Sequence, residues 1–71
     1  MRLAYDLNTD SLYIHLCERT AVDSDEVTNG VVLDFDAEGS LVGIDIQHAS
    51  QKADLSCLMI NHSPFGQLKA A

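Results

Sequence analysis

Two pairs of apolar alternations, each pair interrupted by a short polar stretch, constrain the fold of this chain most. Apolar residues at every second position are typical of a β-strand with one buried face. Each pair therefore predicts an antiparallel hairpin with its large aliphatic side chains on one face. The alternating residues are Leu3, Tyr5 and Leu7 with Leu12, Ile14 and Leu16, and Val31, Leu33 and Phe35 with Val42, Ile44 and Ile46.

The first hairpin is expected to turn over residues 8–11, where Asn, Thr, Asp and Ser all accept turn geometry. A slip of one residue would move the aliphatic side chains into water, so the face is well determined. The expected pairs are Leu7 with Leu12, Tyr5 with Ile14, and Leu3 with Leu16. The opposite face would carry Arg2, Ala4, Asp6, Tyr13, His15 and Cys17.

The second hairpin is expected to turn over residues 37–40, with Gly39 in a left-handed conformation. Gly43 has no side chain to pack, which predicts a bulge or the close approach of another group. The expected pairs are Phe35 with Val42, Leu33 with Ile44, and Val31 with Ile46. The opposite face would carry Val32, Asp34, Asp36, Leu41, Gly43, Asp45 and Gln47.

Residues 20–28, between the hairpins, are interpreted as one irregular strand whose acidic residues keep an exposed edge from pairing with another chain. A solvated loop is the alternative interpretation. The dipeptide at Asn29 and Gly30 predicts a tight turn into the strand that starts at Val31.

A helix is predicted over residues 51–60, with Ser50 as its N-cap and Pro64 beyond its end. Leu55, Leu58 and Met59 recur at helical spacing and would form its apolar stripe. A strand over residues 57–61 is the competing interpretation, because short apolar runs are ambiguous.

The sequence therefore predicts an α+β fold, an antiparallel β-meander of four to five strands with one C-terminal helix packed on the apolar face. A sheet with one apolar face needs a cover, and this helix is the only candidate within the chain. The domain is expected to span residues 1–60. Residues 61–71 would form a tail that either frays or docks on a second subunit.

Composition narrows the classes of function. The net charge is −7, and the four basic residues are scattered along the chain, whereas nucleic-acid binding needs a basic face. We therefore expect no direct binding to nucleic acid or to an anionic membrane. No apolar stretch approaches the ~20 residues that cross a bilayer. With two cysteines and no secretory leader, a cytoplasmic location with reduced thiols is expected.

A set of polar residues could in principle support chemistry. His15 and Cys17 share a strand face, and Asp34 and Asp45 lie on the polar face of the second hairpin. They lack the paired spacing of a zinc site, and neither a third orienting group nor an oxyanion site is visible. We therefore expect no catalytic, metal-binding or cofactor-binding residue, and His15, Cys17, Asp34 and Asp45 are only weak candidates for a polar-face site.

Several short motifs together carry a family resemblance over residues 3–50. They are Tyr5-Asp6, Asp10, Leu12-Tyr13-Ile14, Gly30-Val31, Asp34-Phe35-Asp36, Gly39, Val42-Gly43-Ile44-Asp45-Ile46 and Ala49-Ser50. This set resembles a bacterial family known only as domain of unknown function family 2283, although Asp45 stands where a glutamate is expected. From Cys57 onward no resemblance is found. The resemblance implies a compact β-meander with a C-terminal helix, no established activity and no catalytic residue. Members look as though they accompany small toxin-like proteins, which implies an antitoxin-type role.

The surface left over suggests association. Tyr13, Val32 and Leu41 lie among acids on the face that the helix does not cover, and Phe65 and Leu68 lie in the tail. These five residues are the candidate interface, and a homodimer is expected because so short a chain has a marginal core.

Three functions from different classes follow. The chain is an interaction module, in its most specific form an antitoxin-like partner of a small basic protein. Alternatively it is a structural or assembly subunit that forms a homo-oligomer. The third hypothesis is a metal-dependent enzyme using the polar-face candidates.

Overall fold

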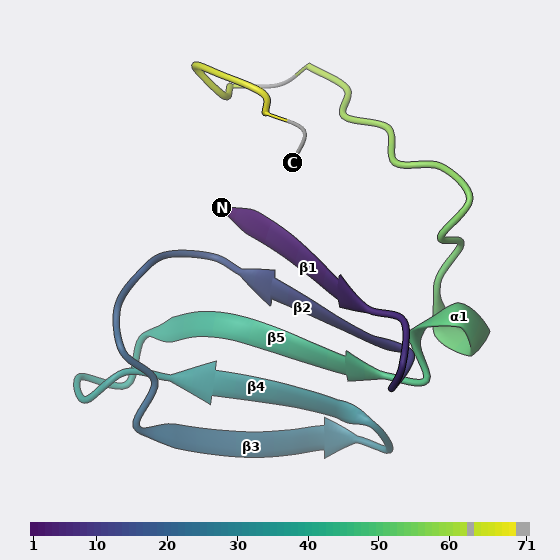
Figure 1. Ribbon diagram of the computed structural model, residues 1–71. Coiled ribbons are helices and arrows are strands. Elements are labelled where there is room, and N and C mark those ends of the chain that lie inside the picture. The colour runs from purple at the N-terminus through teal and green to yellow at the C-terminus, as the bar shows by residue number, and fades with distance from the viewer. Residues whose placement is uncertain (63, 70–71) are drawn as a thin grey trace.

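The computed structural model describes residues 1–62 and 64–69, and its main feature is one antiparallel sheet (Figure 1). The elements are β1 (Arg2–Asp6), β2 (Ser11–His15), β3 (Asp23–Thr28), β4 (Val31–Phe35), β5 (Leu41–Gln47) and α1 (Ala49–Lys52). The strand order is β1-β2-β5-β4-β3. The predicted α+β class is confirmed. Because β2 pairs with β5 rather than β3, the last four strands form a Greek key rather than a simple meander.

The predicted apolar face is also confirmed, because the pairing places the aliphatic residues in two rows that run across four strands. Residues that lie opposite each other on neighbouring strands point to the same face. One row is Leu3, Ile14, Ile44 and Leu33, and the other is Tyr5, Leu12, Ile46 and Val31. We call these eight residues the apolar face.

The register of the first hairpin is shifted by two residues from the predicted one. Tyr5 lies opposite Leu12 rather than Ile14, and Leu3 lies opposite Ile14 rather than Leu16. The turn starts one residue earlier because the Asp6 carboxylate accepts a hydrogen bond from the Asn8 backbone N–H, 2.9 Å. The predicted pair Leu7–Leu12 is therefore wrong, and Leu7 is 81% exposed in the turn. A shift of two keeps every side chain on its predicted face.

The second hairpin follows the predicted register except near its turn. Leu33 lies opposite Ile44 and Val31 opposite Ile46, as predicted, but Phe35 lies opposite Leu41 instead of Val42. A bulge after Asp34 causes the difference. Gly39 has the expected left-handed conformation, with φ of 82°.

The strand prediction for residues 20–28 is confirmed by β3, and the loop interpretation is wrong. β3 begins at Asp23, carries a register shift between Glu26 and Thr28, and forms one edge of the sheet. Gly30 adopts a φ of 77° in the predicted tight turn. Asp25 lies opposite Leu33 and Asp23 opposite Phe35, so acidic side chains form the rim of the apolar face along β3.

The helix prediction over residues 51–60 is wrong in extent. α1 spans only Ala49–Lys52, its N-cap is His48 rather than Ser50, and Ala53 is already extended. Asp54 provides a physical reason, because its carboxylate accepts hydrogen bonds from both the backbone N–H and the hydroxyl of Ser56. Such local bonds compete with helical ones. The competing strand over residues 57–61 is not formed in the described chain.

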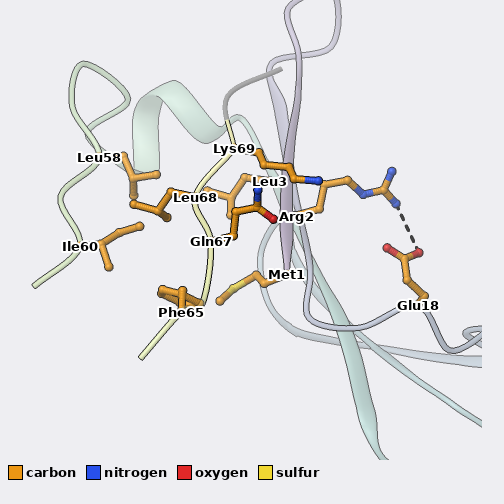
Figure 2. A pocket seen from close by; sticks show the side chains of 10 residues that line it. All are labelled: Met1, Arg2, Leu3, Glu18, Leu58, Ile60, Phe65, Gln67, Leu68 and Lys69. Carbon is orange, nitrogen blue, oxygen red and sulfur yellow. Dashed lines mark ion pairs between the residues drawn. The ribbon is translucent and has the colours of Figure 1, made fainter. Parts of the chain in front are cut away.

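Beyond α1 the chain is extended and returns toward the N-terminus alongside β1 (Figure 1). Met59 is 77% exposed, so the predicted stripe does not cover the sheet. Part of this segment borders a cavity of about 650 Å³ with the N-terminal residues Met1 and Leu3 (Figure 2). The predicted tail of residues 61–71 includes Ser63, Ala70 and Ala71, which lie outside the described residues.

Candidate functional site

The polar face of the sheet carries one row of residues aligned across all five strands. The pairing sets this row, which consists of Arg2, His15, Gly43, Asp34 and Ser24 in the order β1-β2-β5-β4-β3. Gly43 stands at the centre and leaves a gap over β5. The row brings together two of the candidate site residues, His15 and Asp34, that are distant in sequence.

Tyr13 fills the gap that Gly43 leaves. A Cβ atom at position 43 would overlap the Tyr13 hydroxyl and ring. The phenol lies across β5 and donates a hydrogen bond to Asp34 Oδ2, 2.5 Å, while Ser24 Oγ donates to Asp34 Oδ1, 2.7 Å. The hydrogen bond to the Asp34 carboxylate raises the pKa of Tyr13 to about 12. Near neutral pH Tyr13 is therefore a protonated donor and not a base or a nucleophile.

His15 extends this network toward β1. Its ring lies 4.4 Å from the Tyr13 ring, centroid to centroid, and an Arg2 guanidinium nitrogen lies 3.4 Å from Nδ1. Arg2 also forms an ion pair with Glu18 at 3.7 Å, with both side chains well exposed. Exposed pairs of this kind contribute little to stability.

The four polar-face candidates do not converge. Asp34 and His15 are linked only through Tyr13, while Asp45 lies opposite Tyr13 and Cys17 follows β2 as a half-exposed free thiol. No group of three or more His, Cys, Asp or Glu side chains among the described residues is placed to hold a metal ion. Sequence reasoning missed the roles of Tyr13 and Ser24. The signal that could have revealed Tyr13 is the glycine at position 43, because a strand glycine makes room for a neighbouring group.

A second polar cluster joins the first turn to α1 and centres on Asp10. Its carboxylate accepts hydrogen bonds from the Tyr5 hydroxyl, 2.7 Å, and from the Ser50 backbone N–H and hydroxyl, 3.0 and 2.6 Å. The Ala49 N–H donates to the Asp10 carbonyl. The bonds from Ser50 and Tyr5 hold the pKa of Asp10 below its ordinary value, and the same carboxylate raises the pKa of Tyr5.

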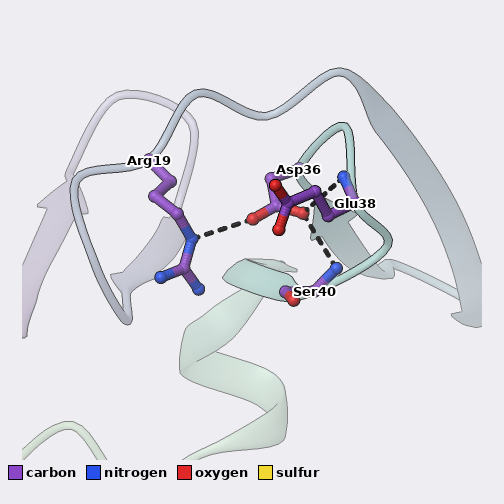
Figure 3. A network of polar contacts seen from close by, with 4 residues as sticks. All are labelled: Arg19, Asp36, Glu38 and Ser40. Atoms are coloured by element: carbon purple, nitrogen blue, oxygen red, sulfur yellow. Dashed lines mark hydrogen bonds and ion pairs between the residues drawn. The ribbon is translucent and has the colours of Figure 1, made fainter.

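A third polar cluster closes the turn between β4 and β5 around the buried Asp36 (Figure 3). One carboxylate oxygen accepts the N–H groups of Glu38 and Ser40, both at 2.9 Å, and the other accepts Arg19 Nε at 2.8 Å. The backbone hydrogen bond from Ser40, with those from Glu38 and Arg19, lowers the pKa of Asp36. This carboxylate therefore holds the turn and has little capacity left for a ligand.

The apolar face, unlike the polar clusters, is only partly covered by the rest of the described chain. Val42 and Ala49 are the only buried hydrophobic residues in the described chain, and Leu3 is 46% exposed. The extended segment after α1 borders the face at residues of β1, β2 and β5, around a cavity of about 400 Å³. That cavity is lined by Leu3, Leu12, Ile14 and Ile46 from the sheet and by Ala53, Asp54, Leu55, Cys57 and Leu58 from the segment.

The sequence-predicted interface residues are dispersed. Tyr13 and Val32 lie in one row on the polar face, with the Tyr13 hydroxyl already bonded to Asp34. Leu41 is beside Phe35 at the bulge, and Phe65 and Leu68 border the cavity beside the N-terminus (Figure 2). An interface through these five residues stays a prediction.

Comparison with known protein families gives a match over most of the chain. The family model described as "Protein of unknown function (DUF2283)" matches residues 2–50. The chain belongs to this family. The DUF2283 match contains the whole sheet and all three polar clusters, and it ends at Ser50, which closes the Asp10 cluster. No curated protein and no solved structure gives a significant match. None of the described helices has the length and apolar character needed to span a membrane.

The contact between Tyr13 and Gly43 generates a stability prediction. Gly43→Ala forces the Tyr13 ring off the strand, and we expect the free energy of unfolding, measured with urea, to fall by about 1–3 kcal/mol. Gly66→Ala is the control, because a Cβ there meets no atom within 4 Å, and its effect should stay within ~0.5 kcal/mol. In a Tyr13→Ala background, Gly43→Ala should lower the free energy of unfolding by much less. An equal cost in both backgrounds would show that the ring is not the cause.

The Asp36 cluster generates a pH prediction. Because the native pKa lies below the ordinary 3.8, ionised Asp36 stabilises the fold above that value, and the contribution disappears as the pH falls through the native pKa. Asp36→Asn should therefore lower the thermal midpoint near neutral pH, and its deficit against wild type should shrink on acidification. Asp25→Asn is a control with the same charge change, since the Asp25 carboxylate makes no hydrogen bond or ion pair with the described residues and Asp25 is exposed. A deficit for Asp36→Asn that stays constant down to about pH 2 contradicts the prediction.

Proposed function

We propose that this protein is a noncatalytic protein-interaction module and that the apolar face of its sheet is the binding surface. The observation that carries the proposal is the pair of aliphatic rows across β1, β2, β5 and β4. The segment after α1 borders Leu3, Leu12, Ile14 and Ile46 of these rows, and no residue of β4 lines that cavity. Leu3 and Tyr5 of these rows are exposed and the other six residues are half-buried, and a contiguous apolar surface that stays accessible is typical of protein–protein contact sites.

The polar residues support a noncatalytic role. Asp10 and Asp36 each accept three hydrogen bonds within the chain, and Tyr13 is held protonated by Asp34. Catalytic acids and bases need free proton-transfer capacity in a cleft. These side chains instead connect turns and strands, which is a structural use.

Charge favours a second, more specific form of the proposal, in which the partner is a small basic protein and the role is antitoxin-like. The net charge is −7, and Asp23, Asp25 and Glu26 are exposed on the edge strand β3. An acidic surface attracts a basic protein and repels nucleic acid. The free thiols of Cys17 and Cys57 support a reducing, cytoplasmic setting.

The test uses two neighbouring residues on β1 that point to opposite faces. Leu3→Arg places a charge on the apolar face, and Ala4→Arg places the same charge on the polar face. Both positions are exposed, so both variants should fold, as circular dichroism can check. A tagged chain, coexpressed with its untagged copy in the native host, should retain a stoichiometric protein in the wild-type and Ala4→Arg forms and lose it in the Leu3→Arg form. Retention by all three forms would refute the proposed surface.

A further inference from the structure

We infer that this protein binds a free long-chain carboxylate of the fatty-acid type in a trough between the sheet and the segment after α1. The trough consists of the two cavities of about 400 and 650 Å³ that border this segment. Each volume lies in the range of about 300–1,000 Å³ that is typical of small-molecule sites. The ligand is a small amphiphile rather than a protein, so the inference goes beyond the proposed function and does not depend on it.

The two cavities lie end to end along the segment, because Leu3 of β1 and Leu58 of the segment line both of them. The smaller cavity includes Ala53, which follows α1, and the larger one includes Met1. The trough therefore runs back along β1 together with the extended segment (Figure 1). An extended segment beside a strand encloses an elongated space, which suits a linear aliphatic chain better than a compact ring.

The walls of the trough are mainly aliphatic and remain in contact with water. On the segment, Leu58 and Leu68 are each 69% exposed. The sheet contributes three half-buried residues, Leu12, Ile14 and Ile46. An aliphatic chain in the trough removes apolar surface of both walls from water, which favours binding.

The distribution of basic residues determines the head group of the ligand. Of the four basic residues in the chain, Arg19 and Lys52 are used in hydrogen bonds elsewhere. The other two, Arg2 and Lys69, both line the larger cavity (Figure 2). Lys69 makes no ion pair with the described residues, and Arg2 has only the exposed pair with Glu18 at 3.7 Å. Such a pair is weak, so the guanidinium can exchange Glu18 for a ligand carboxylate.

The two ends of the trough carry opposite charges, which orients the ligand. Asp54 lines the smaller cavity, so an anionic head group is repelled from that end. Arg2 and Lys69 attract it to the other end, at the edge strand β1. There a carboxylate can accept charge-assisted hydrogen bonds from both cations. The aliphatic chain then passes Leu58 toward the smaller cavity.

Titration of the isotope-labelled full chain with sodium dodecanoate tests the inference, by two-dimensional NMR below the concentration at which micelles form. We expect saturable binding of one molecule per chain, with signal shifts at Leu3 and Leu58. Leu58→Asp should weaken binding at least about 10-fold, because a charge enters the middle of the trough. Met59→Asp is the matched control, since Met59 is the next residue, is 77% exposed and lines neither cavity.

Dodecylammonium has the same aliphatic chain with the opposite charge and therefore tests the head group. Judged from the signals of Leu3 and Leu58, it should bind the wild type several-fold more weakly than dodecanoate does. Lys69 is exposed, so Lys69→Glu should fold normally. This variant should weaken binding of dodecanoate several-fold and strengthen binding of dodecylammonium.

Three results would overturn the inference. Dodecanoate could cause no saturable shift at Leu3 and Leu58, Met59→Asp could weaken binding as much as Leu58→Asp, or dodecylammonium could bind the trough more tightly than dodecanoate. A wild type that retains a protein partner but binds no dodecanoate refutes this inference alone and leaves the proposed function standing.

Discussion

The whole structure depends on a one-sided β-sheet that the rest of the described chain covers only in part. Alternation places most large apolar residues of β1, β2, β4 and β5 on one face, with Val32 as an exception on the polar face. A buried core needs a second layer of comparable area. The chain supplies a helix of four residues and an extended segment that reaches only part of the face. The apolar area buried within the described chain is therefore small, and other interactions must keep the strands in register.

Polar side chains supply those interactions at the places where the chain reverses or crosses. Asp10 ties the first turn to the residues after β5, and Asp36 closes the turn between β4 and β5. Tyr13 spans the central strand and joins β2 to β4 through Asp34. Each cluster satisfies backbone or hydroxyl donors with a carboxylate, which is a strong type of hydrogen bond. The clusters explain how a sheet with so little buried apolar surface keeps a defined register.

The faces of the strands were predictable from the sequence because they depend only on a period of two, and a register shift of two in the first hairpin left them unchanged. The bulge after Asp34 was predictable from Gly43, because a strand glycine predicts a bulge or the close approach of another group, and the register shifts directly beside Gly43, over which Tyr13 lies. The helix prediction failed because apolar spacing at Leu55 and Leu58 carries no information about the competing bonds between Asp54 and Ser56. The role of Tyr13 was not predictable, because its partner Asp34 is distant in sequence and the two come close only across β5, which lies between β2 and β4.

The two edges of the sheet differ in how accessible they are for strand pairing. β3 carries three acidic residues and a register shift, both of which discourage strand pairing. Along β1, the extended segment borders the N-terminal residues and shares a cavity with Leu3. Edge-to-edge growth would produce an open, extending assembly, whereas packing through one face uses up that face in a single contact. The acidic residues and the register shift of β3 therefore disfavour growth of the sheet through that edge.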